Sequence, residues 1–331
     1  MKPIIKILVT GGTIDMVRSL DNGAVVPSPQ VDAMIQELPQ RKELSVEVER
    51  LFNLPSPHVS PHIMVEMAQK IRQELARQDV QGVVVTHGTD ILEETAYLVD
   101  LIVQSDKPIV FTGAMRTNTE LGADGLRNLY GSIMTAAAEN ARGQGTLVVM
   151  NDDIYAARDV TKVHSAHVDA FDSLEFGPLG TINDDQVIFY RRTPLREYIP
   201  VCTVNPDVYL IKFVAGMDGS LIQFCLERNA AGIVLEGFGV GDITPWALES
   251  VAEGIRRGIP LVLASRCPMG GVRSVYAYQG GSKQLEELGV IMAGLLNGPK
   301  ARIKLMVALA YTHDLEKIRR IFSENQPFLP L

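Results

Sequence analysis

The chain has 331 residues, of which 46% are hydrophobic and 21% charged, a composition typical of ordinary globular proteins that argues against extensive disorder. At roughly 150 residues per domain, this length predicts two domains. The net charge is −8 and no Lys/Arg-rich run is present, so we expect neither a nucleic-acid partner nor a membrane-surface role. No apolar run reaches the roughly 18 to 20 residues that span a bilayer, and we find no secretory signal, so we predict a cytoplasmic location.

Cysteine and histidine spacing gives no sign of a disulfide framework or a metal site. Cys202, Cys225 and Cys267 are odd in number and widely spaced, which is typical of thiols in a reducing compartment. His164 and His167 are three residues apart, as metal ligands on a helix can be, but no Glu or Cys is placed with them. We therefore predict no metal ligands among these residues.

The first half of the chain alternates short apolar segments with amphipathic ones. The apolar segments are rich in Val and Ile and barely alternate in polarity, which predicts strands buried on both faces of a parallel sheet. They cover residues 4–9, 46–52, 83–86, 109–112 and 147–150.

Three helices are predicted between these strands. Ser60 and Pro61 have the order of an N-cap and a first helical residue. Asp90 and Glu93 suggest a capping box for a helix that runs to about Val103, and a third helix covers 126–138. Alternation of strands and helices predicts a doubly wound α/β domain.

The second half begins with a different pattern and then repeats the α/β alternation. Segments 173–175 and 186–190 flank a turn at 183–185 and predict a hairpin, and a Pro- and Arg-rich linker follows. Further strands are predicted at 209–214, 232–235 and 260–264, with helices at 221–228, 245–257 and 301–311. We therefore predict a larger N-terminal α/β domain over 1–190 with a mostly parallel sheet, a linker over 191–208, and a smaller C-terminal parallel-sheet domain over 209–331.

Small hydroxyl residues and glycines follow four of the predicted strands. Ligands of open parallel sheets bind outside the carboxyl ends of the strands, so these residues are candidates for a site. The four segments are Thr10-Gly11-Gly12-Thr13, Asn53-Leu54-Pro55-Ser56, Thr86-His87-Gly88-Thr89-Asp90 and Thr112-Gly113-Ala114-Met115-Arg116. Glycines let a backbone approach a ligand closely, and a threonine hydroxyl can act as a nucleophile when a base is near.

Lys162, which follows the fifth strand, is a candidate base for one of these threonines. A lysine that is desolvated beside a carboxylate can lose its proton, so Thr89, Asp90 and Lys162 could do the work of a Ser–His–Asp triad. Each residue alone also fits a structural role: Asp90 as a helix N-cap, Thr13 as a turn residue, Lys162 as a solvated charge. The hypothesis of a site rests on four strand ends that carry the same chemistry.

Together these segments resemble the bacterial L-asparaginases of the type I/II family, and the resemblance covers nearly the whole chain. Its most specific pieces are Thr10-Gly11-Gly12-Thr13-Ile14 and Thr86-His87-Gly88-Thr89-Asp90. Further pieces are Gly113-Ala114-Met115-Arg116, Ala123-Asp124-Gly125 with Asn128-Leu129-Tyr130, Asp159-Val160-Thr161-Lys162 and Lys300-Ala301-Arg302. The resemblance implies two α/β domains and hydrolysis of L-asparagine to L-aspartate and ammonia, with no metal or organic cofactor. It also implies a homodimer or homotetramer with sites at the subunit interfaces.

Carried over position by position, the resemblance implies catalytic roles for four residues. Thr13 would attack from a mobile loop, Thr89 would supply a second hydroxyl, Asp90 would orient, and Lys162 would be the base. Which threonine forms the covalent bond stays open. The segment 15–26 contains the turn signal Asp21-Asn22-Gly23, and we expect it to form a lid loop of about a dozen residues.

Substrate contacts are implied for Gly12, Ser56, Gly88 and Ala114, with a backbone group near Gly88 suited to an oxyanion. The chain also departs from the family pattern. Relatives place a tyrosine on the lid, whereas Ala24 or Val25 falls near that place here. Proline follows Ser56, and an isoleucine follows Asp90 where a threonine is usual. Two alternatives therefore stay open: an amidohydrolase that acts on L-glutamine or a peptide asparagine, and a non-catalytic binder of aspartate or asparagine.

Overall fold

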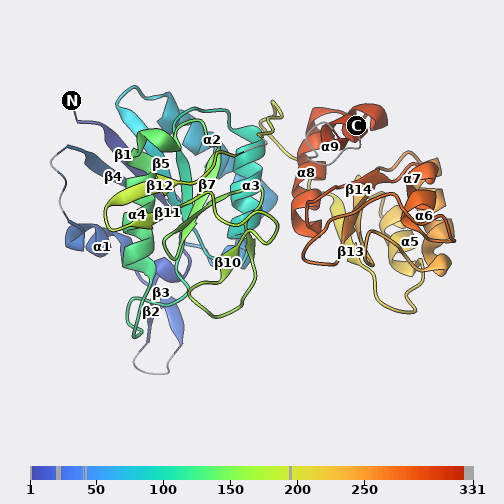
Figure 1. The fold of residues 1–331 in the computed structure, drawn as a ribbon, viewed down its shortest axis with the longest axis horizontal. Coiled ribbons are helices and arrows are strands. Elements are labelled where there is room, and N and C mark those ends of the chain that lie inside the picture. Colours follow the sequence, from blue (N-terminus) through green and yellow to red (C-terminus); the bar gives the residue numbers. More distant parts are fainter. Residues whose placement is uncertain (1, 20–23, 40, 42, 194–195, 324–331) are drawn as a thin grey trace. The chain divides into compact units, whose positions relative to one another are not determined.

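The computed structural model describes residues 2–19, 24–39, 41, 43–193 and 196–323. The chain divides into two compact units, Met1–Tyr198 and Ile199–Leu331 (Figure 1). The boundary between them lies inside the segment 191–208. Within the described residues, no helix combines the length and the apolar character that crossing a membrane requires.

Five parallel strands form the centre of the first unit. They are β1 (Ile4–Val9), β4 (Ser45–Arg50), β5 (Val80–Thr86), β6 (Ile109–Thr112) and β7 (Thr146–Met150). In space they lie in the order β4-β1-β5-β6-β7. The chain passes from β1 to β4 on one side and then crosses to β5 on the other side of β1, so the strand order reverses between β1 and β5. Doubly wound sheets bind ligands at this switch point.

Three antiparallel strands extend the sheet beyond β7. They are β8 (Asp153–Ala156), β11 (Gly180–Asn183) and β12 (Gln186–Phe189). The predicted hairpin exists as β11 and β12, but its first strand was placed wrongly at 173–175. The backbone there closes a turn, since the N–H of Phe176 donates to Ser173 O at 3.1 Å. The prediction of a mostly parallel sheet in a larger N-terminal domain is confirmed.

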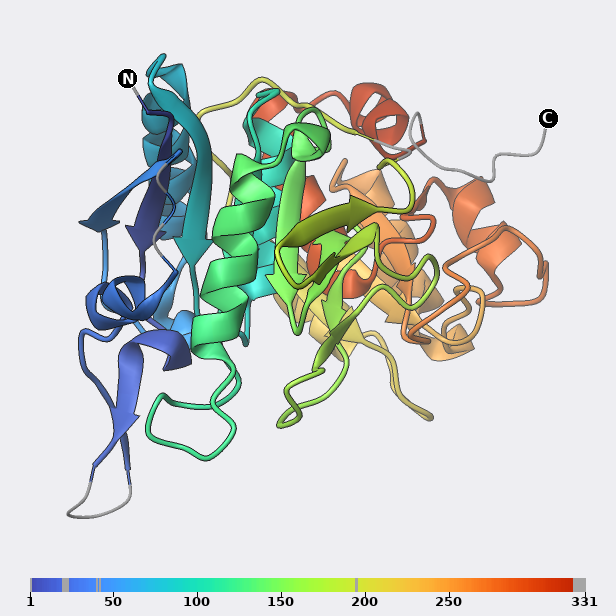
Figure 2. The ribbon, with the colours of Figure 1, turned by 60° about the vertical axis from the view of Figure 1, so that its left-hand side comes forward.

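Helices cover both faces of this sheet. One face carries α1 (Val31–Glu37) and α4 (Gly125–Ala137), and Leu129 and Ile133 of α4 share a buried core with Ile5 and Ile7 of β1 (Figure 2). Two further helices of this unit are α2 (Pro61–Ala76) and α3 (Leu92–Ile102). The start of α2 is as predicted, because the Ser60 side chain accepts a hydrogen bond from the N–H of Ile63.

The capping box predicted for α3 is wrong. The residue at the N-cap position is Ile91, and no side chain caps the helix. The Asp90 carboxylate instead forms an ion pair with a residue far along the chain, as described below. A charged long-range partner has taken the place of the local backbone contact that the spacing suggested.

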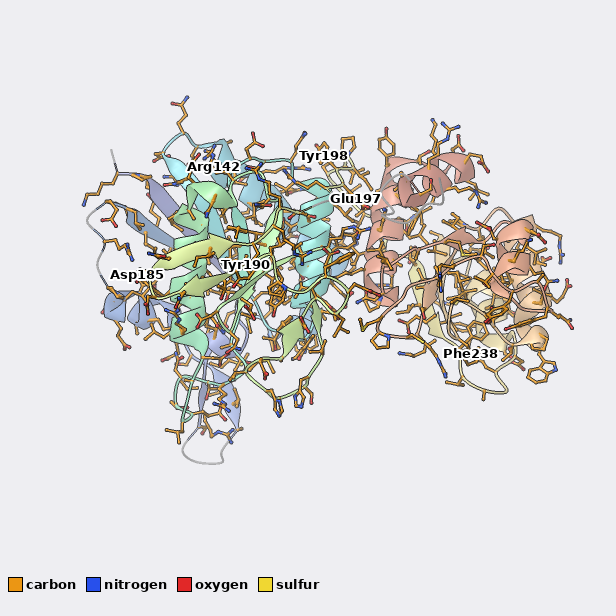
Figure 3. The ribbon with its side chains drawn as sticks, in the orientation of Figure 1. Arg142, Asp185, Tyr190, Glu197, Tyr198 and Phe238 are labelled. Carbon is orange, nitrogen blue, oxygen red and sulfur yellow. The ribbon has the colours of Figure 1, made fainter. Side chains whose placement is uncertain are left out.

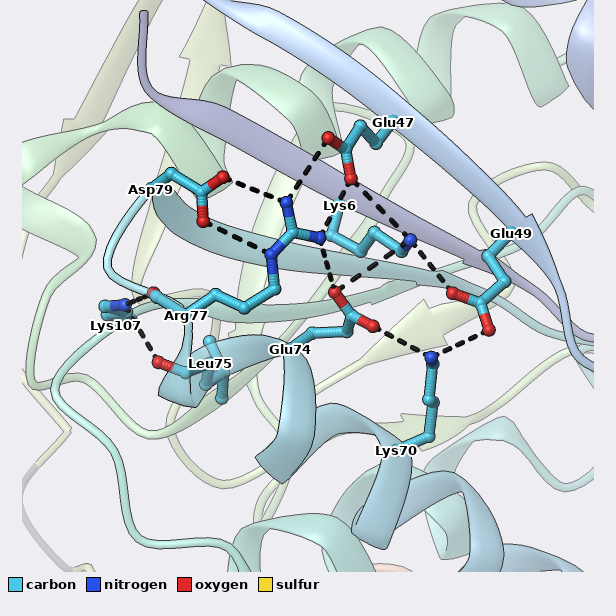
Figure 4. A network of polar contacts seen from close by, with 9 residues as sticks. All are labelled: Lys6, Glu47, Glu49, Lys70, Glu74, Leu75, Arg77, Asp79 and Lys107. Carbon is cyan, nitrogen blue, oxygen red and sulfur yellow. Dashed lines mark hydrogen bonds and ion pairs between the residues drawn. The ribbon is translucent and has the colours of Figure 1, made fainter. Parts of the chain in front are cut away.

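Charged side chains join β1, β4 and α2 into one ion network (Figure 4). Its members are Lys6, Glu47, Glu49, Lys70, Glu74, Arg77 and Asp79. Lys70 Nζ lies 2.8 Å from carboxylate oxygens of both Glu49 and Glu74. Lys6 Nζ lies 2.9 Å from Glu49 and 3.9 Å from Glu74. Each of these lysines therefore faces more than one carboxylate.

The second unit is a smaller α/β layer structure around a parallel sheet. Its strands, in spatial order, are β13 (Val208–Lys212), β14 (Gly232–Gly237), β15 (Leu261–Ser265) and β16 (Ile291–Met292). Its helices are α5 (Ser220–Glu227), α6 (Leu248–Arg256), α7 (Ser282–Leu288), α8 (Gly298–Tyr311) and α9 (Leu315–Ser323). Ile222, Leu226 and Val251 from α5 and α6 pack against Ile233 and Leu235 of β14. The prediction of a smaller parallel-sheet domain is confirmed.

Candidate active site

The loops after β1 and β5 meet at the switch point of the larger sheet. The Thr10 hydroxyl donates to Thr86 O at 2.7 Å, and both residues are buried. Gly12 has a positive φ of 85°, and a Cβ built on it would lie 2.5 Å from Gly88 Cα. Only a residue without a side chain allows this approach. The structure therefore brings the two glycines of the predicted site into direct backbone contact.

Lys162 reaches this place from a strand 73 positions along the chain from Thr89. It lies in β9 (Thr161–Lys162), which pairs with β10 (Phe171–Asp172). The Lys162 ammonium donates to Thr89 Oγ1 at 2.9 Å and to Asp90 Oδ1 at 2.8 Å. Thr89 is 6% exposed and the Lys162 side chain 15%, whereas the Asp90 side chain is 59% exposed. A hydroxyl, an amine and a carboxylate are thus joined in series.

The segment that leads into β9 is anchored by buried charges. Arg158 Nη1 donates to Asp159 at 3.3 Å, and Arg158 Nε lies 3.7 Å from Glu197 Oε1. Glu197, which Figure 3 labels, also accepts from the Tyr97 hydroxyl of α3 at 3.2 Å. Because α3 follows Asp90 and Arg158 precedes Lys162, these contacts tie together the two chain segments that carry the amine and its partners.

His87 stabilises the backbone beside Thr89. Its Nδ1–H donates to Gly88 O at 2.8 Å, and the Thr95 hydroxyl is 3.1 Å from its Nε2. A carbonyl can only accept, so Nδ1 carries the proton and Nε2 accepts. Complete burial lowers the pKa of His87 to about 4, and the ring is therefore neutral near pH 7. Sequence reasoning assigned no role to this histidine.

Ser56 and Ala114, the other two predicted contact residues, lie on neighbouring loops. Ser56 is buried in a short 3-10 helix, and its Oγ accepts from the N–H of Asp90 at 3.3 Å. Ala114 is fully buried and follows Gly113 in the loop after β6. All four predicted strand ends therefore border one region of the first unit.

Thr13 begins a 3-10 helix, Thr13–Asp15, directly after Gly12, and is partly buried. Its neighbour Asp15 is fully buried and accepts from Arg50 Nη1 at 2.6 Å and from the N–H of Gln30 at 2.6 Å. These bonds fix the base of the segment that was predicted to be a lid.

That segment is a hairpin and not a loop. Strands β2 (Met16–Arg18) and β3 (Val25–Pro27) pair in antiparallel fashion, with Val17 opposite Val26. The Arg18 guanidinium donates to Glu120 at 2.8 Å. The backbone N–H of Arg18 donates to Thr119 Oγ1 at 3.1 Å. Apolar residues on both sides of the turn signal, Met16-Val17 before it and Val25-Val26 after it, could have predicted the pairing. The Asp21-Asn22-Gly23 turn itself lies outside the described residues.

Asp124 and Asn128, at the start of α4, hold the loop after β6. Both lie in segments that carried the family resemblance, yet sequence reasoning gave neither a role. Asp124 accepts from the N–H of Met115 at 2.9 Å and of Arg116 at 2.9 Å. The spacing of four residues at a helix start was the available signal, because it places both side chains on one face.

No metal site emerges from the described parts of the chain, where no group of three His, Cys, Asp or Glu side chains could hold an ion. His164 and His167 are exposed, and their rings stack with centroids 3.5 Å apart. His164 Nδ1 accepts from the backbone N–H of Ala166 at 3.0 Å. His164 Nδ1 also accepts from the N–H of His167 at 3.1 Å, so the pair is held by contacts within its own exposed loop.

Comparison with known proteins adds two matches to family models and several relatives. Residues 4–195 match the family "Asparaginase, N-terminal", and residues 207–322 match "Glutaminase/Asparaginase C-terminal domain". The chain is 36% identical to L-asparaginase 2 of Bacillus subtilis, over 97% of this chain and 86% of that protein. It is 38% identical to a probable L-asparaginase of Deinococcus radiodurans, over 98% of each.

A solved structure shares both the fold and the sequence pattern. It is described as a probable cytoplasmic L-asparaginase from Campylobacter jejuni. It matches with a TM-score of 0.86 at 34% identity, over 97% of this chain and 99% of that chain. Both units of the structure, together with the residues at the switch point, fall within the matched regions. The chain therefore belongs to the asparaginase family.

Proposed function

We propose that this protein hydrolyses the side-chain amide of L-asparagine to L-aspartate and ammonia. The observation that carries the proposal is the Lys162 amine, which is within hydrogen-bond distance of both Thr89 Oγ1 and Asp90 Oδ1. Amide hydrolysis needs an activated nucleophile and a group that returns a proton to the leaving nitrogen. This series of side chains contains both, and it lies at the switch point between β1 and β5.

The reaction proceeds through an ester in the proposed mechanism. With Lys162 in its base form, the amine takes the Thr89 proton, and a threonine oxygen bonds to the amide carbon. The carbon–nitrogen bond then breaks, and the ammonium returns its proton to the departing ammonia. The Asp90 carboxylate stabilises the transient ammonium. Water that is deprotonated by the same amine cleaves the ester and releases aspartate.

Two threonines can provide the attacking oxygen. Thr89 has the amine at 2.9 Å. Thr13 follows Gly12, whose backbone touches Gly88, so it could attack while Thr89 passes its proton to Lys162. These two possibilities can be separated by quenching the reacting enzyme with acid and locating the aspartyl ester by mass spectrometry. The modified peptide contains either residue 13 or residue 89.

Substrate binding is assigned to the loops around the relay. Ser56 would hold the substrate α-carboxylate, while Gly12, Gly88 and Ala114 would form the wall around the amide. A backbone N–H near Gly88 would stabilise the oxyanion, and donors of this type contribute strongly to acyl transfer. The proposed route uses only groups of the polypeptide and no cofactor.

L-glutamine is the second candidate substrate. The family model matched by residues 207–322 covers glutaminases as well as asparaginases. Ile91, where relatives carry a threonine, and Pro57, which is exposed beside Ser56, remove two polar side chains near the relay. Either change could alter the length of the substrate that fits, and a parallel assay with glutamine tests this.

We further propose that the protein acts in the cytoplasm as a homodimer or homotetramer whose sites are completed by a neighbouring subunit. The location is supported by the likeness to the Campylobacter jejuni protein, which is described as a probable cytoplasmic L-asparaginase. Light scattering during size-exclusion chromatography gives the mass in solution. Mixing two inactive variants, each changed in a different unit, tests whether sites are shared, because shared sites would restore part of the activity.

The test of the function is ammonia release from L-asparagine, with L-glutamine and D-asparagine assayed beside it. We expect release from L-asparagine, its loss in Thr89→Val, and partial retention in Thr89→Ser, which keeps the hydroxyl. A folded parent protein that releases no ammonia from any of the three would refute the proposed hydrolysis. Stabilisation by aspartate without turnover would then favour the non-catalytic binder.

A further inference from the structure

The loop after β6 is held by two side chains from the first turns of α4. Asn128 Nδ2 donates to Gly113 O at 3.0 Å and to Asp124 Oδ2 at 3.0 Å. Its Oδ1 accepts from the N–H of Asn151 at 2.9 Å. Asn128 is 1% exposed, so both donor hydrogens and its acceptor are used inside the protein. The amide therefore connects three segments that are distant in sequence.

The Gly113 backbone, which Asn128 holds, is in direct contact with Thr89. A Cβ built on Gly113 would lie 2.5 Å from His87 O and 3.1 Å from Thr89 Cγ2, so the loop backbone packs against the Thr89 methyl group. The N–H of His87 also donates to Thr112 O at 2.8 Å. The methyl and the hydroxyl of a threonine share one χ1 angle, and a methyl held in place fixes the direction of the hydroxyl.

We propose that Asn128 is a positioning residue for Thr89. It holds the Gly113 carbonyl, the Gly113 backbone supports the Thr89 methyl group, and the Thr89 hydroxyl is thereby kept in line with the Lys162 amine. Asn128 itself does not contact the amine or the hydroxyl. The expected effect on kcat rests on the proposed function. The expected effect on the distance between Thr89 and Lys162 does not depend on turnover.

Asn128→Asp tests the proposal with little change in volume. The variant keeps Oδ1 as the acceptor for Asn151 and replaces the donor amide by an oxygen, which faces the Gly113 carbonyl and the Asp124 carboxylate. Repulsion between these acceptors would move the loop. We expect kcat for ammonia release to fall about 10- to 100-fold, because a misplacement of about 1 Å can cost that much. KM for asparagine should change by less than about threefold.

Thr135→Val is the matched control on the same helix. Thr135 is fully buried, and its hydroxyl donates to Gly131 O at 2.8 Å, within α4 and away from the Gly113 loop. The control should lower the melting temperature and leave kcat unchanged. Equal losses of kcat in both variants, or a kcat of Asn128→Asp equal to that of the parent, would overturn the proposal.

Crystal structures of the parent and of Asn128→Asp give a second readout that needs no activity. The distance from Thr89 Oγ1 to Lys162 Nζ is 2.9 Å in the parent, and we expect it to exceed about 3.5 Å in the variant. An unchanged distance would contradict the positioning role. A parent that releases no ammonia would count against the proposed function alone, because the distance still decides the role of Asn128.

Discussion

Lysines meet carboxylates in two regions of the first unit, and the two arrangements differ. In the ion network on β1, β4 and α2, Lys70 lies 2.8 Å from two carboxylates (Figure 4). At the switch point, Lys162 meets one carboxylate, that of Asp90, and one hydroxyl, that of Thr89. Charge pairing alone does not separate a structural lysine from a candidate base, but the identity of the second partner does.

The two carboxylates around Lys70 have a direct effect on its protonation. The hydrogen bond to Glu49, with that to Glu74 next, raises the pKa of Lys70 above its usual value, so its proton is held firmly. A base must release and accept protons at the working pH, and a lysine between two carboxylates is unsuited to that task. Lys162 has a partner with a proton of its own to give. The positions of the two lysines agree with this assignment. Of Lys70 and Lys162, only Lys162 lies beside the carboxyl ends of the parallel strands.

The largest expected effect follows from removing the single carboxylate at the switch point. In Asp90→Asn the Lys162 ammonium loses its charged partner, and we expect kcat for asparagine to fall about 100- to 10,000-fold. The Asp90 side chain is 59% exposed, so the melting temperature should hardly change. Steady-state ammonia release and calorimetry on one preparation check both statements. A kcat within about threefold of the parent would remove Asp90 from the relay.

For the ion network we expect the opposite result, a loss of stability without a loss of activity. Glu74 receives Lys6, Lys70 and Arg77, and its side chain is 7% exposed. Glu74→Gln leaves three cations around a neutral group, so we expect the free energy of unfolding to fall by about 3 kcal/mol. The activity of the folded enzyme should remain. Urea unfolding measures the loss.

Asp79→Asn provides the matched control for that experiment. Asp79 bonds to Arg77 alone among the network cations, at 3.0 Å, and its side chain is 35% exposed. We expect its removal to cost much less stability than Glu74→Gln, because exposed ion pairs contribute little. If both variants lost equal stability, burial would not be what distinguishes the members of the network.

A smaller effect is expected from the pH dependence of stability. The pKa of His87 is lowered by burial from 6.5 to about 4 in the folded state. Between these values the unfolded chain binds a proton that the folded protein does not, so this residue's contribution is present above pH 6.5 and is lost as the pH falls toward 4. The loss approaches about 1.4 kcal/mol per pH unit between these two values. His87→Asn, which keeps a donor for Gly88 O, should flatten this part of the profile.

Asp100 offers a control of opposite sign. This buried carboxyl of α3 accepts from the N–H of Thr146 at 2.7 Å, and burial raises its pKa from 3.8 to about 6. Here the unfolded chain loses its proton first, so stability falls as the pH rises from about 4 to 6. Asp100→Asn should therefore steepen the rise of stability over the range in which His87→Asn flattens it. Parallel changes in the two profiles would contradict the assigned burial effects.

The sequence predicted the parts of the molecule in which local pattern and tertiary structure agree. Val- and Ile-rich segments became the parallel strands, and Ser60 capped its helix, because both signals act within a few residues. The strand-end rule also located the loops of the candidate site. Contacts between distant segments were harder to predict. Lys162 was a candidate base because it follows the fifth strand, but nothing in the spacing shows that it reaches Thr89.

Two of the three failures come from such long-range contacts, and the third is local. The capping box predicted from Asp90 and Glu93 does not form, because the Asp90 carboxylate pairs with Lys162, 72 positions away. Asn128 received no role because two of its partners, Gly113 and Asn151, lie in other segments of the chain. The hairpin at Met16–Pro27 was missed because a turn signal was interpreted without the apolar pairs on either side of it.

The most direct test of the central claim compares two lysines that both bind carboxylates. Ammonia release from L-asparagine should be measured for Lys162→Met and Lys70→Met, each confirmed to be folded at the assay temperature. We predict that Lys162→Met loses at least about 1,000-fold in kcat, while Lys70→Met stays within about twofold of the parent. Retained activity in Lys162→Met, or equal losses in the two variants, would contradict the account.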